Sequence, residues 1–564
     1  MSCRSWFKFI APGSAPRDKR TYKRRNDMEL QSFGFINWLV LGTYLCANIV
    51  LGFVLSKKVT TANDFFVGQR NIPWWAIGIS VVATYVSALS FLGGPAWSYT
   101  EGLSVIAIHL NYPIVIFIVI AFFLPFFFNS GCASIYEYLE KRFGPTTRSV
   151  ISIIFLISQC LTSAAILYAT ALVLEFITGM PVVYAIIIIT LIALVYTIMG
   201  GLAAVIWTDV IQAFILLAGA LIITVSLINN LNLPLGETLE LLKSQGKTNP
   251  LNFSFDVTEV STVWTGVIAM TLFHITVYGA NQMMVQRTLA SKNIGDAKKS
   301  FLMMGYFAIF ISFLFFLLGI LFYSYYGARE FDNGNTIILE FASSLAIPGL
   351  MGIIAAAVIA ASMSSLDSAF NSMSTVTTID FYQKYAKPNA SQEHYLLASR
   401  LFTVFWALAI IIPAFMYTKS NGSVLETLSK LGSYFVGAKL AMFGLGFFSK
   451  HTTEKGLLTG VVAGFGVLFW VATSTDIAWP WYCAIGGIVN ITVSITASLI
   501  ISGRQTEYSR YSVEGQKKYF ADNNLPEKDG GWYLVPGRID KQTYWLLLFF
   551  VGSIAGLYLF NQLI

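Results

Sequence analysis

The chain has 564 residues, of which 56% are hydrophobic and only 12% are charged. Soluble chains carry about 25% charged residues, so this composition is typical of an integral membrane protein, as is the mean hydropathy of +0.66. It excludes a disordered protein, a nucleic-acid-binding protein and a disulfide-stapled secreted domain. The five cysteines are scattered, without a CxxC pair or a metal-ligand spacing. We interpret them as inert apolar residues.

The net charge of +7 is unevenly placed. Residues 1–27 hold eight basic and two acidic residues, which leaves +1 for the rest of the chain. The basic balance therefore belongs to a tail and not to a binding surface.

Apolar segments follow one another along almost the whole chain. A helix needs about 20 apolar residues to cross a bilayer. Fourteen segments meet this requirement: 34–55, 73–98, 103–128, 149–177, 182–200, 203–230, 259–279, 300–326, 347–378, 396–418, 424–449, 455–474, 479–502 and 542–562. The sequence therefore predicts an all-α integral membrane protein with about 14 transmembrane helices. The polar connection 503–541 is expected to pack on the surface.

Lysine and arginine in the loops predict the orientation. The loops on the side of the N-terminal tail (1–33) carry four of these residues, and the loops on the other side carry 20. The basic side is expected to be cytoplasmic in a plasma (inner) membrane, so both termini face outward. The basic tail contradicts this rule. We expect that residues 1–27 come from a misplaced start codon before Met28. The alternative is a genuine tail whose effect on orientation is outweighed by the thirteen later helices. The intact mass of the native protein distinguishes the two.

Two of the segments are interrupted at membrane depth. Segment 73–98 contains a run of Ser, Gly and Pro residues, and segment 259–279 ends in a polar run. Unwound backbone at this depth is tolerated only where it lines a cavity or is buried in protein. The interrupted segments lie five segments apart, which predicts two inverted five-helix repeats with a binding site between them. Two kinked structural helices are the alternative. The predicted divisions are the first flanking helix and loop 34–72, the repeats 73–230 and 259–449, the extracellular loop 231–258, and the flanking helices 450–564 with the cytoplasmic loop 503–541.

Segment 347–378 carries six hydroxyl or carboxylate groups within residues 362–372. Hard cations such as Na⁺ prefer oxygen ligands, so this pattern predicts an ion site; serines that pack between helices are the alternative. Asp209 in segment 203–230 is a second candidate, because a membrane carboxylate is costly unless it is paired or functional. Its place near the start of its segment fits either a second, inner cation site or an interfacial position.

Three further polar residues lie in apolar helices. His109 and His274 are either satisfied core residues or substrate contacts. Lys439 is the clearest intramembrane cation, and its neighbours GSYFVGAKL almost imitate a phosphate loop. Ala438 stands where that loop needs its lysine, so we reject nucleotide binding. The sequence contains no HExxH motif and no nucleophile elbow, and we expect no enzyme.

Several stretches, in the same order, resemble the sodium/solute symporter family, the group of the bacterial sodium/galactose transporter and its sodium/glucose relatives. They are DFFVGQRNIPWWAIGIS, EYLEKRFG, GGLAAVIWTDVIQ, NQMMVQRTLASK, SSLDSAFNS with TIDFYQKY, and FFSKHTTEKG, from about Asn63 to Thr459. The resemblance implies two inverted five-helix repeats with flanking helices.

The resemblance also implies two cation sites. The main sodium site would use the carbonyls of Ala83, Val86 and Ala361 and the hydroxyls of Ser364 and Ser365. A possible second sodium site would use Asp209, Asp367 and Ser368. Asp367 stands where the family has Thr or Ser, and it either strengthens this site or accepts a proton.

The sugar-site positions of the family differ in this chain. Leu89 replaces a glutamate of the galactose transporter, Val277 replaces its gating tyrosine, and Thr162 replaces the arginine with which sialic-acid members hold a carboxylate. No arginine is expected deep in any helix, which argues against an organic anion. The candidate substrate pocket is Ser87, Ser90, His109, Thr162, His274, Tyr278 and Ser429.

We therefore expect a sodium-coupled symporter that imports a small hydroxylated organic solute, such as a sugar or polyol, by alternating access. Its partners would be the solute, sodium ions and the lipid bilayer, with no nucleic acid and no organic cofactor; the oligomeric state is open. A proton-coupled or organic-acid or amino-acid symporter of the same fold is the first alternative. A solute-sensing membrane protein is the alternative from another class.

Overall fold

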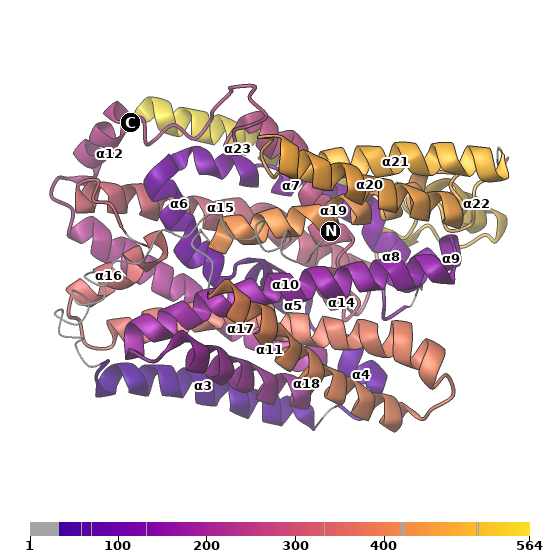
Figure 1. Cartoon of the computed structure of the whole chain (residues 1–564), viewed down its shortest axis with the longest axis horizontal. Coiled ribbons are helices and arrows are strands. Elements are labelled where there is room, and N and C mark those ends of the chain that lie inside the picture. The colour runs from indigo at the N-terminus through magenta and orange to yellow at the C-terminus, as the bar shows by residue number, and fades with distance from the viewer. Residues whose placement is uncertain are drawn as a thin grey trace.

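The computed structural model describes residues 33–57, 59–68, 70–130, 132–331, 333–418, 424–503, 505 and 507–564. The expectations for the tail 1–27 and for a start at Met28 lie outside these residues. The described chain is a bundle whose long helices run along one axis (Figure 1).

The first half of the chain forms α3 (Phe35–Ser56), α4 (Ala62–Val67), α5 (Trp74–Tyr85), the π-helical turn η1 (Leu89–Gly93), α6 (Gly94–Glu101), the 3₁₀ helix η2 (Leu103–His109), α7 (Tyr112–Ile118), the π-helical turn η3 (Val119–Phe123), α8 (Leu124–Ser130), α9 (Tyr136–Arg142), α10 (Pro145–Thr178), α11 (Val182–Asn229) and α12 (Leu235–Ser244).

The second half forms the π-helical turn η4 (Thr265–Ala269), α13 (Met270–Gly279), α14 (Gln282–Thr288), α15 (Ile294–Tyr326), the 3₁₀ helix η5 (Gly334–Thr336), α16 (Ile337–Ser344), α17 (Leu350–Val376), the π-helical segment η6 (Thr377–Ala386), α18 (Gln392–Tyr417), α19 (Val424–Phe448), α20 (Glu454–Ser474), α21 (Trp481–Ser502), α22 (Val513–Asp522), the antiparallel pair β1 (Lys528–Asp529) and β2 (Trp532–Tyr533), η7 (Lys541–Thr543) and α23 (Tyr544–Leu563).

Each predicted apolar segment falls on one or more of these helices. Within the described ranges, ten helices are long and apolar enough to cross a membrane, and eleven if one bent pair counts as a single span. The all-α membrane class is therefore confirmed, and the number of fourteen crossings stays a prediction.

The segments 182–200 and 203–230 are joined in α11, where two separate helices are expected. Its 48 residues would extend about 72 Å if straight, more than twice the thickness of a bilayer core. The chain turns at Gly201, which has φ 55° and ψ −154°. A Cβ atom at this position would lie 2.8 Å from the carbonyl oxygen of Phe65, so only glycine fits both the conformation and the contact.

The first predicted interruption is a sharp bend. α5 ends at Tyr85, the next residue Val86 leaves the helical conformation (φ −79°, ψ 88°), and the axis changes by 57° before the chain continues through η1 and α6. The second interruption lies between α13 and α14, where the side chain of Asn281 accepts a hydrogen bond from the backbone N–H of Met283 at 3.0 Å. This cap starts α14 after a break of two residues.

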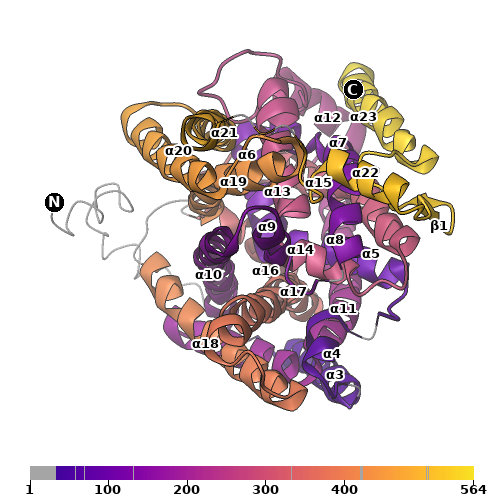
Figure 2. The same ribbon diagram turned by 90° about the vertical axis from the view of Figure 1, so that its right-hand side faces the viewer.

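α17 and α14 lie inside the bundle. Figure 2 shows α3 and α18 on one rim and α20 and α21 on the opposite rim. Of the most apolar stretch of the helix that contains α17, 89% is buried, so its serines and its aspartate face protein and not lipid.

The polar connection 503–541 packs across one end of the bundle, where α9 and α22 lie (Figure 1). We call this the basic end, because it carries the lysine-rich and arginine-rich loops. The hydroxyl of Tyr138 donates to the carbonyl of Tyr511 at 2.7 Å, and buried Lys298 pairs with Asp540 at 2.5 Å.

An ion-pair network joins α9, α10 and η6 at the basic end. Buried Arg148 donates to Asp380 at 2.8 and 2.6 Å and to Glu140 at 2.6 Å, and Lys384 pairs with Glu140 at 2.7 Å. Partial burial alone would raise the pKa of Glu140, but hydrogen bonds from Arg148 and Lys384 outweigh it and lower that pKa. The network therefore fixes η6 to the start of α10.

We expect Asp380→Asn to destabilise the protein by about 3 kcal/mol, because it leaves the buried Arg148 guanidinium with one carboxylate less. Thermal unfolding of the purified protein in detergent measures this. The control Glu514→Gln removes an exposed pair with Lys517 and should cost less than about 1 kcal/mol. Equal effects of the two substitutions would show that the network does not support the fold.

Candidate functional site

Oxygen atoms from α5 and α17 meet where α5 breaks. Ser364 Oγ lies 3.0 Å from the carbonyl oxygens of both Ala83 and Ala361, which share its single donor hydrogen. Ser365 Oγ donates to the carbonyl oxygen of Thr84 at 3.0 Å. The break deprives the last carbonyls of α5 of their helical partners, and the serine hydroxyls take that place.

Four of the five residues expected for the main sodium site therefore meet. Ala83, Ala361, Ser364 and Ser365 are all buried, with at most 3% exposure. The fifth, Val86, caps the C-terminal end of α5, and it takes no part in these hydrogen bonds. Uncharged carbonyl and hydroxyl oxygens are ligands that suit a hard monovalent cation.

A second polar cluster surrounds Asp209 on α11. Its Oδ2 atom accepts from Ser80 at 2.5 Å and from Thr84 at 3.4 Å, and it pairs with Arg287 at 3.3 Å. Arg287 also donates to Ser80 at 2.8 Å and to the hydroxyl of Ser368. The Oδ1 atom of Asp209 is buried and has no hydrogen-bond partner in the described part of the chain.

Arg287 corrects two expectations. It is one of the 20 lysine and arginine residues counted in the loops that the sequence predicts to be cytoplasmic, and the sequence predicts no arginine deep in a helix. Its side chain on α14 is only 1% exposed and lies between α5, α11 and α17. The short helix α14 folds back into the bundle after the second break, so a residue that follows an apolar segment in sequence becomes buried in space.

Asp367 lies next to this cluster. Its Oδ2 atom accepts from the hydroxyl of Tyr196 at 3.0 Å, and its Oδ1 atom accepts from the backbone N–H of Ser368 at 2.6 Å. The cluster thus contains two buried carboxylates and one guanidinium, which gives a net charge of −1 when both acids are ionised. A buried net charge is costly, so the cluster can accept one further monovalent cation or a proton.

A third cluster gathers histidine and tyrosine rings from four elements, α5, η2, α7 and α13. The amide nitrogen of Asn111 donates to the carbonyls of Ile108 and Gly266, at 3.0 and 2.8 Å. Its oxygen therefore accepts from His274 Nδ1 at 2.7 Å. This leaves Nε2 of a neutral His274 to accept from the hydroxyl of Tyr85 at 3.0 Å.

The same cluster includes three of the expected pocket residues. His109 Nδ1 bonds the hydroxyl of Tyr112 at 2.6 Å, and the rings of His109 and His274 lie 6.3 Å apart. The ring of Tyr278 lies 5.5 Å from that of Tyr85, and its buried hydroxyl has no partner among the described residues. The sequence pointed to His109, His274 and Tyr278 and missed Tyr85 and Tyr112.

The remaining pocket candidates lie on other elements. Ser87 and Ser90 are at the break between α5 and η1, Thr162 is half-buried on α10, and Ser429 is half-buried on α19. Among the described contacts of the ring cluster, none involves Ser87, Ser90 or Thr162. A small cavity of about 20 Å³ borders the break; its lining includes Ala88, Leu89, Leu92, Ala169, Asn335 and Thr336.

A broken helix whose carbonyls meet the hydroxyls of a serine-rich helix, inside a bundle of apolar helices, is typical of a multi-pass membrane transporter. A sequence model of the sodium:solute symporter family matches residues 65–464, and the chain belongs to this family.

Two relatives and one solved structure are similar over most of the chain. The sodium/sialic acid symporter NanT of Aliivibrio fischeri is 29% identical over 473 residues, which cover 83% of this chain and 93% of that protein. The sodium/glucose cotransporter of Vibrio parahaemolyticus is 30% identical, with 76% and 83% covered. The structure of a Na⁺-coupled sialic acid symporter in a substrate-bound outward-open state has 28% identity and a TM-score of 0.78, with 83% and 99% covered.

The chain is therefore a Na⁺-coupled symporter and not an enzyme, and its partners are sodium ions and a small-molecule solute. The family resemblance found in the sequence motifs is confirmed.

Proposed function

We propose that the protein imports a small hydroxylated organic solute together with Na⁺ by alternating access. The observation that carries the proposal is the meeting of Ser364 and Ser365 with the carbonyls at the break of α5. A cation held there would tie α17 to α5. Separation of these two helices would release it.

The proposed architecture is the one expected from the sequence. Fourteen crossings would include the inverted repeats 73–230 and 259–449, with the basic end in the cytoplasm and both termini outside a plasma (inner) membrane. The main sodium site would consist of Ala83, Val86, Ala361, Ser364 and Ser365. Asp209, Asp367 and Ser368 would form the inner cation site, which Arg287 already partly neutralises.

The proposed solute pocket lies beside the first break. The ring cluster offers imidazole and phenol groups at one side, and Ser87 and Ser90 offer hydroxyls at the break itself. Aromatic faces and neutral polar groups suit a hydroxylated solute. The names of the similar proteins, one for sialic acid and one for glucose, support this class.

The driving force is sufficient for concentrative uptake. One charge that crosses 100 mV contributes about 2.3 kcal/mol, and a tenfold sodium gradient adds about 1.4 kcal/mol. Together, roughly 3.7 kcal/mol supports an accumulation on the order of 500-fold for one Na⁺ and a neutral solute. A second cation at the inner site would roughly square this ratio.

A thermal-shift screen tests the proposal. We expect the melting temperature of the purified protein to rise with a sugar, polyol or hydroxylated acid in NaCl, and to rise much less in KCl, because Na⁺ and solute bind together. A compound that stabilises the protein equally in both salts, with an effect that changes with pH, would favour the proton-coupled alternative.

A further inference from the structure

Four lysine or arginine side chains are buried in the described part of the chain: Arg148, Arg287, Lys298 and Lys439. The first three each pair with a carboxylate, at 2.6, 3.3 and 2.5 Å respectively. Lys439 has no carboxylate partner within 4.0 Å among those residues. It is therefore the exception among the buried cations that the structure describes.

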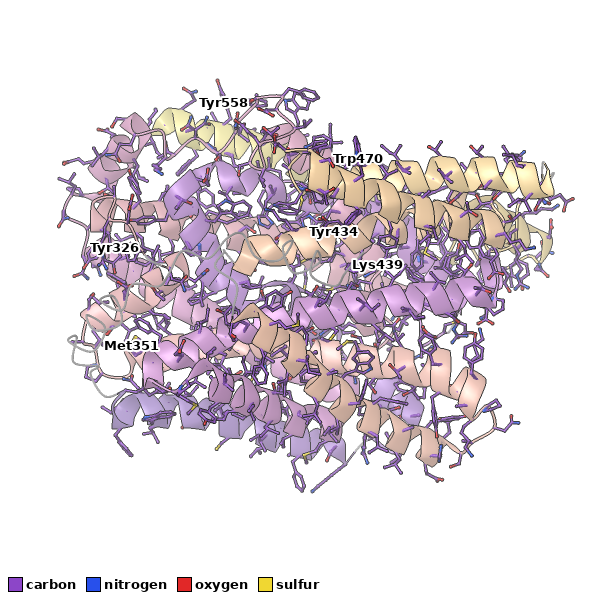
Figure 3. All side chains as sticks on the ribbon, viewed as in Figure 1. Tyr326, Met351, Tyr434, Lys439, Trp470 and Tyr558 are labelled. Carbon is purple, nitrogen blue, oxygen red and sulfur yellow. The ribbon has the colours of Figure 1, made fainter. Side chains whose placement is uncertain are left out.

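Lys439 lies on α19, between the two ends of the bundle (Figure 3), and is 5% exposed. Its Nζ atom donates to Ser158 Oγ at 2.9 Å and lies 5.7 Å from the centre of the Phe155 ring. The hydroxyl of Ser158 donates its own hydrogen to the carbonyl of Phe155 at 3.0 Å. One hydrogen of the ammonium group is thus satisfied, and the other two have no hydrogen-bond acceptor among the residues that the structure describes.

A second unsatisfied donor lies nearby. The ring of Tyr136 packs against that of Phe155, with centroids 5.6 Å apart, and its hydroxyl is buried without a hydrogen-bond partner in the described residues. Phe155 thus has Lys439 and Tyr136 as neighbours. A buried ammonium group that has no carboxylate partner among the described residues is complementary to an anion.

The site adjoins the proposed solute pocket. α19 packs against α10 and α13, which carry the pocket candidates Thr162 and His274. Ser158 and Thr162 are four residues apart on α10 and therefore share a face. An anionic group held by Lys439 would lie about one helical turn from the level of Thr162.

We propose that Lys439 is the counter-charge for a carboxylate of the transported solute, which makes the solute a hydroxylated organic acid and not a neutral sugar. This inference rests on the proposed function, because it assigns the charge of the solute in the same pocket. An organic anion does not need an arginine in this pocket, because the ammonium group of Lys439 supplies the positive charge.

The experiment measures binding of matched acid and neutral compounds to the full-length protein in NaCl. The pairs are glucuronate with glucose, N-acetylneuraminate with N-acetylmannosamine, and lactate with glycerol. We expect at least one acid to bind while its neutral partner does not. Lys439→Met should weaken that binding by about 30-fold or more, because it removes one member of a buried charge pair. Lys439→Arg should retain most of it.

Two controls keep the result interpretable. Lys455→Met makes the same substitution at an exposed position on α20 and should leave binding unchanged. Lys439→Met should fold at least as well as the parent, because it removes an unpaired buried charge. Stabilisation by NaCl without solute, and its loss in Ser365→Ala, tests the proposed sodium site separately.

Three results would overturn the inference: equal binding of an acid and its neutral partner, unchanged binding of the acid to Lys439→Met, or binding of no acid in the panel. If Na⁺ alone also fails to stabilise the parent protein, the proposed function fails as well. If Na⁺ still stabilises it, only the assignment of Lys439 fails.

Discussion

Ser365→Ala is expected to abolish sodium-stimulated uptake while the protein still folds. The substitution removes the hydroxyl that meets the carbonyl of Thr84 at 3.0 Å, and with it one of two hydroxyl ligands of the proposed main site. Loss of a partner in the outer shell of a metal site already costs about 10- to 100-fold in affinity, so loss of a direct ligand should cost at least as much. The cost in folding stability is about 1 kcal/mol, that of one hydrogen bond.

The measurement is solute uptake into vesicles as a function of sodium concentration. Ser374→Ala is the matched control, because Ser374 is also buried on α17 and donates to the carbonyl of Ser399 at 2.6 Å. It should lose a similar amount of stability and keep its sodium dependence. An unchanged sodium dependence in Ser365→Ala would refute the assignment of the site.

The apolar helices, and the meeting of the serines of α17 with the carbonyls at the break of α5, could be predicted because their signals are local. Apolar length fixes a crossing helix, and the serines of α17 are close in sequence. The break of α5 is visible in its run of small and polar residues. Thr84 was missed although its carbonyl lies beside that of Ala83, because backbone atoms have no residue-type signal. A break in a helix leaves several consecutive carbonyl groups without helical partners. The carbonyl of Thr84 is therefore expected beside that of Ala83.

The partners of the polar side chains could not be predicted in this way. Tyr85 comes from one stretch of the apolar sequence and the adjacent Asn111 and Tyr112 from another, and only the packing of α5, α7 and α13 brings them to His274. An asparagine inside an apolar run was an available signal, because it must find partners there. A buried Asp209 likewise needs a cationic partner, and this requirement predicts a buried arginine or lysine such as Arg287.

Arg287→Gln is expected to make the fold dependent on sodium. The substitution removes the guanidinium that pairs with Asp209 and donates to Ser80 and Ser368. It leaves two buried carboxylates, Asp209 and Asp367, without a cation. Breaking a buried ion pair on one side costs about 3–5 kcal/mol, which is a large part of the stability of an ordinary domain.

We expect Na⁺, which is much smaller than choline, to replace the missing charge at this buried cluster. We therefore expect Arg287→Gln to melt well below the parent in choline chloride and to recover much of the difference in NaCl. The double variant Arg287→Gln with Asp209→Asn removes both members of the pair and should need less Na⁺ for its stability. Arg538→Gln, which removes an exposed pair with Glu527, controls for the general effect of a lost arginine.

The sodium response of Arg287→Gln also decides how the inner cluster works in the parent. A recovery that saturates with sodium would mean that the carboxylates form a cation site that Arg287 occupies in part, so that a second Na⁺ must compete with the guanidinium. A variant as stable as the parent in choline would mean that the carboxylates do not need a cation. The guanidinium would then be a packing group, and the charge argument for a second cation would fail with it.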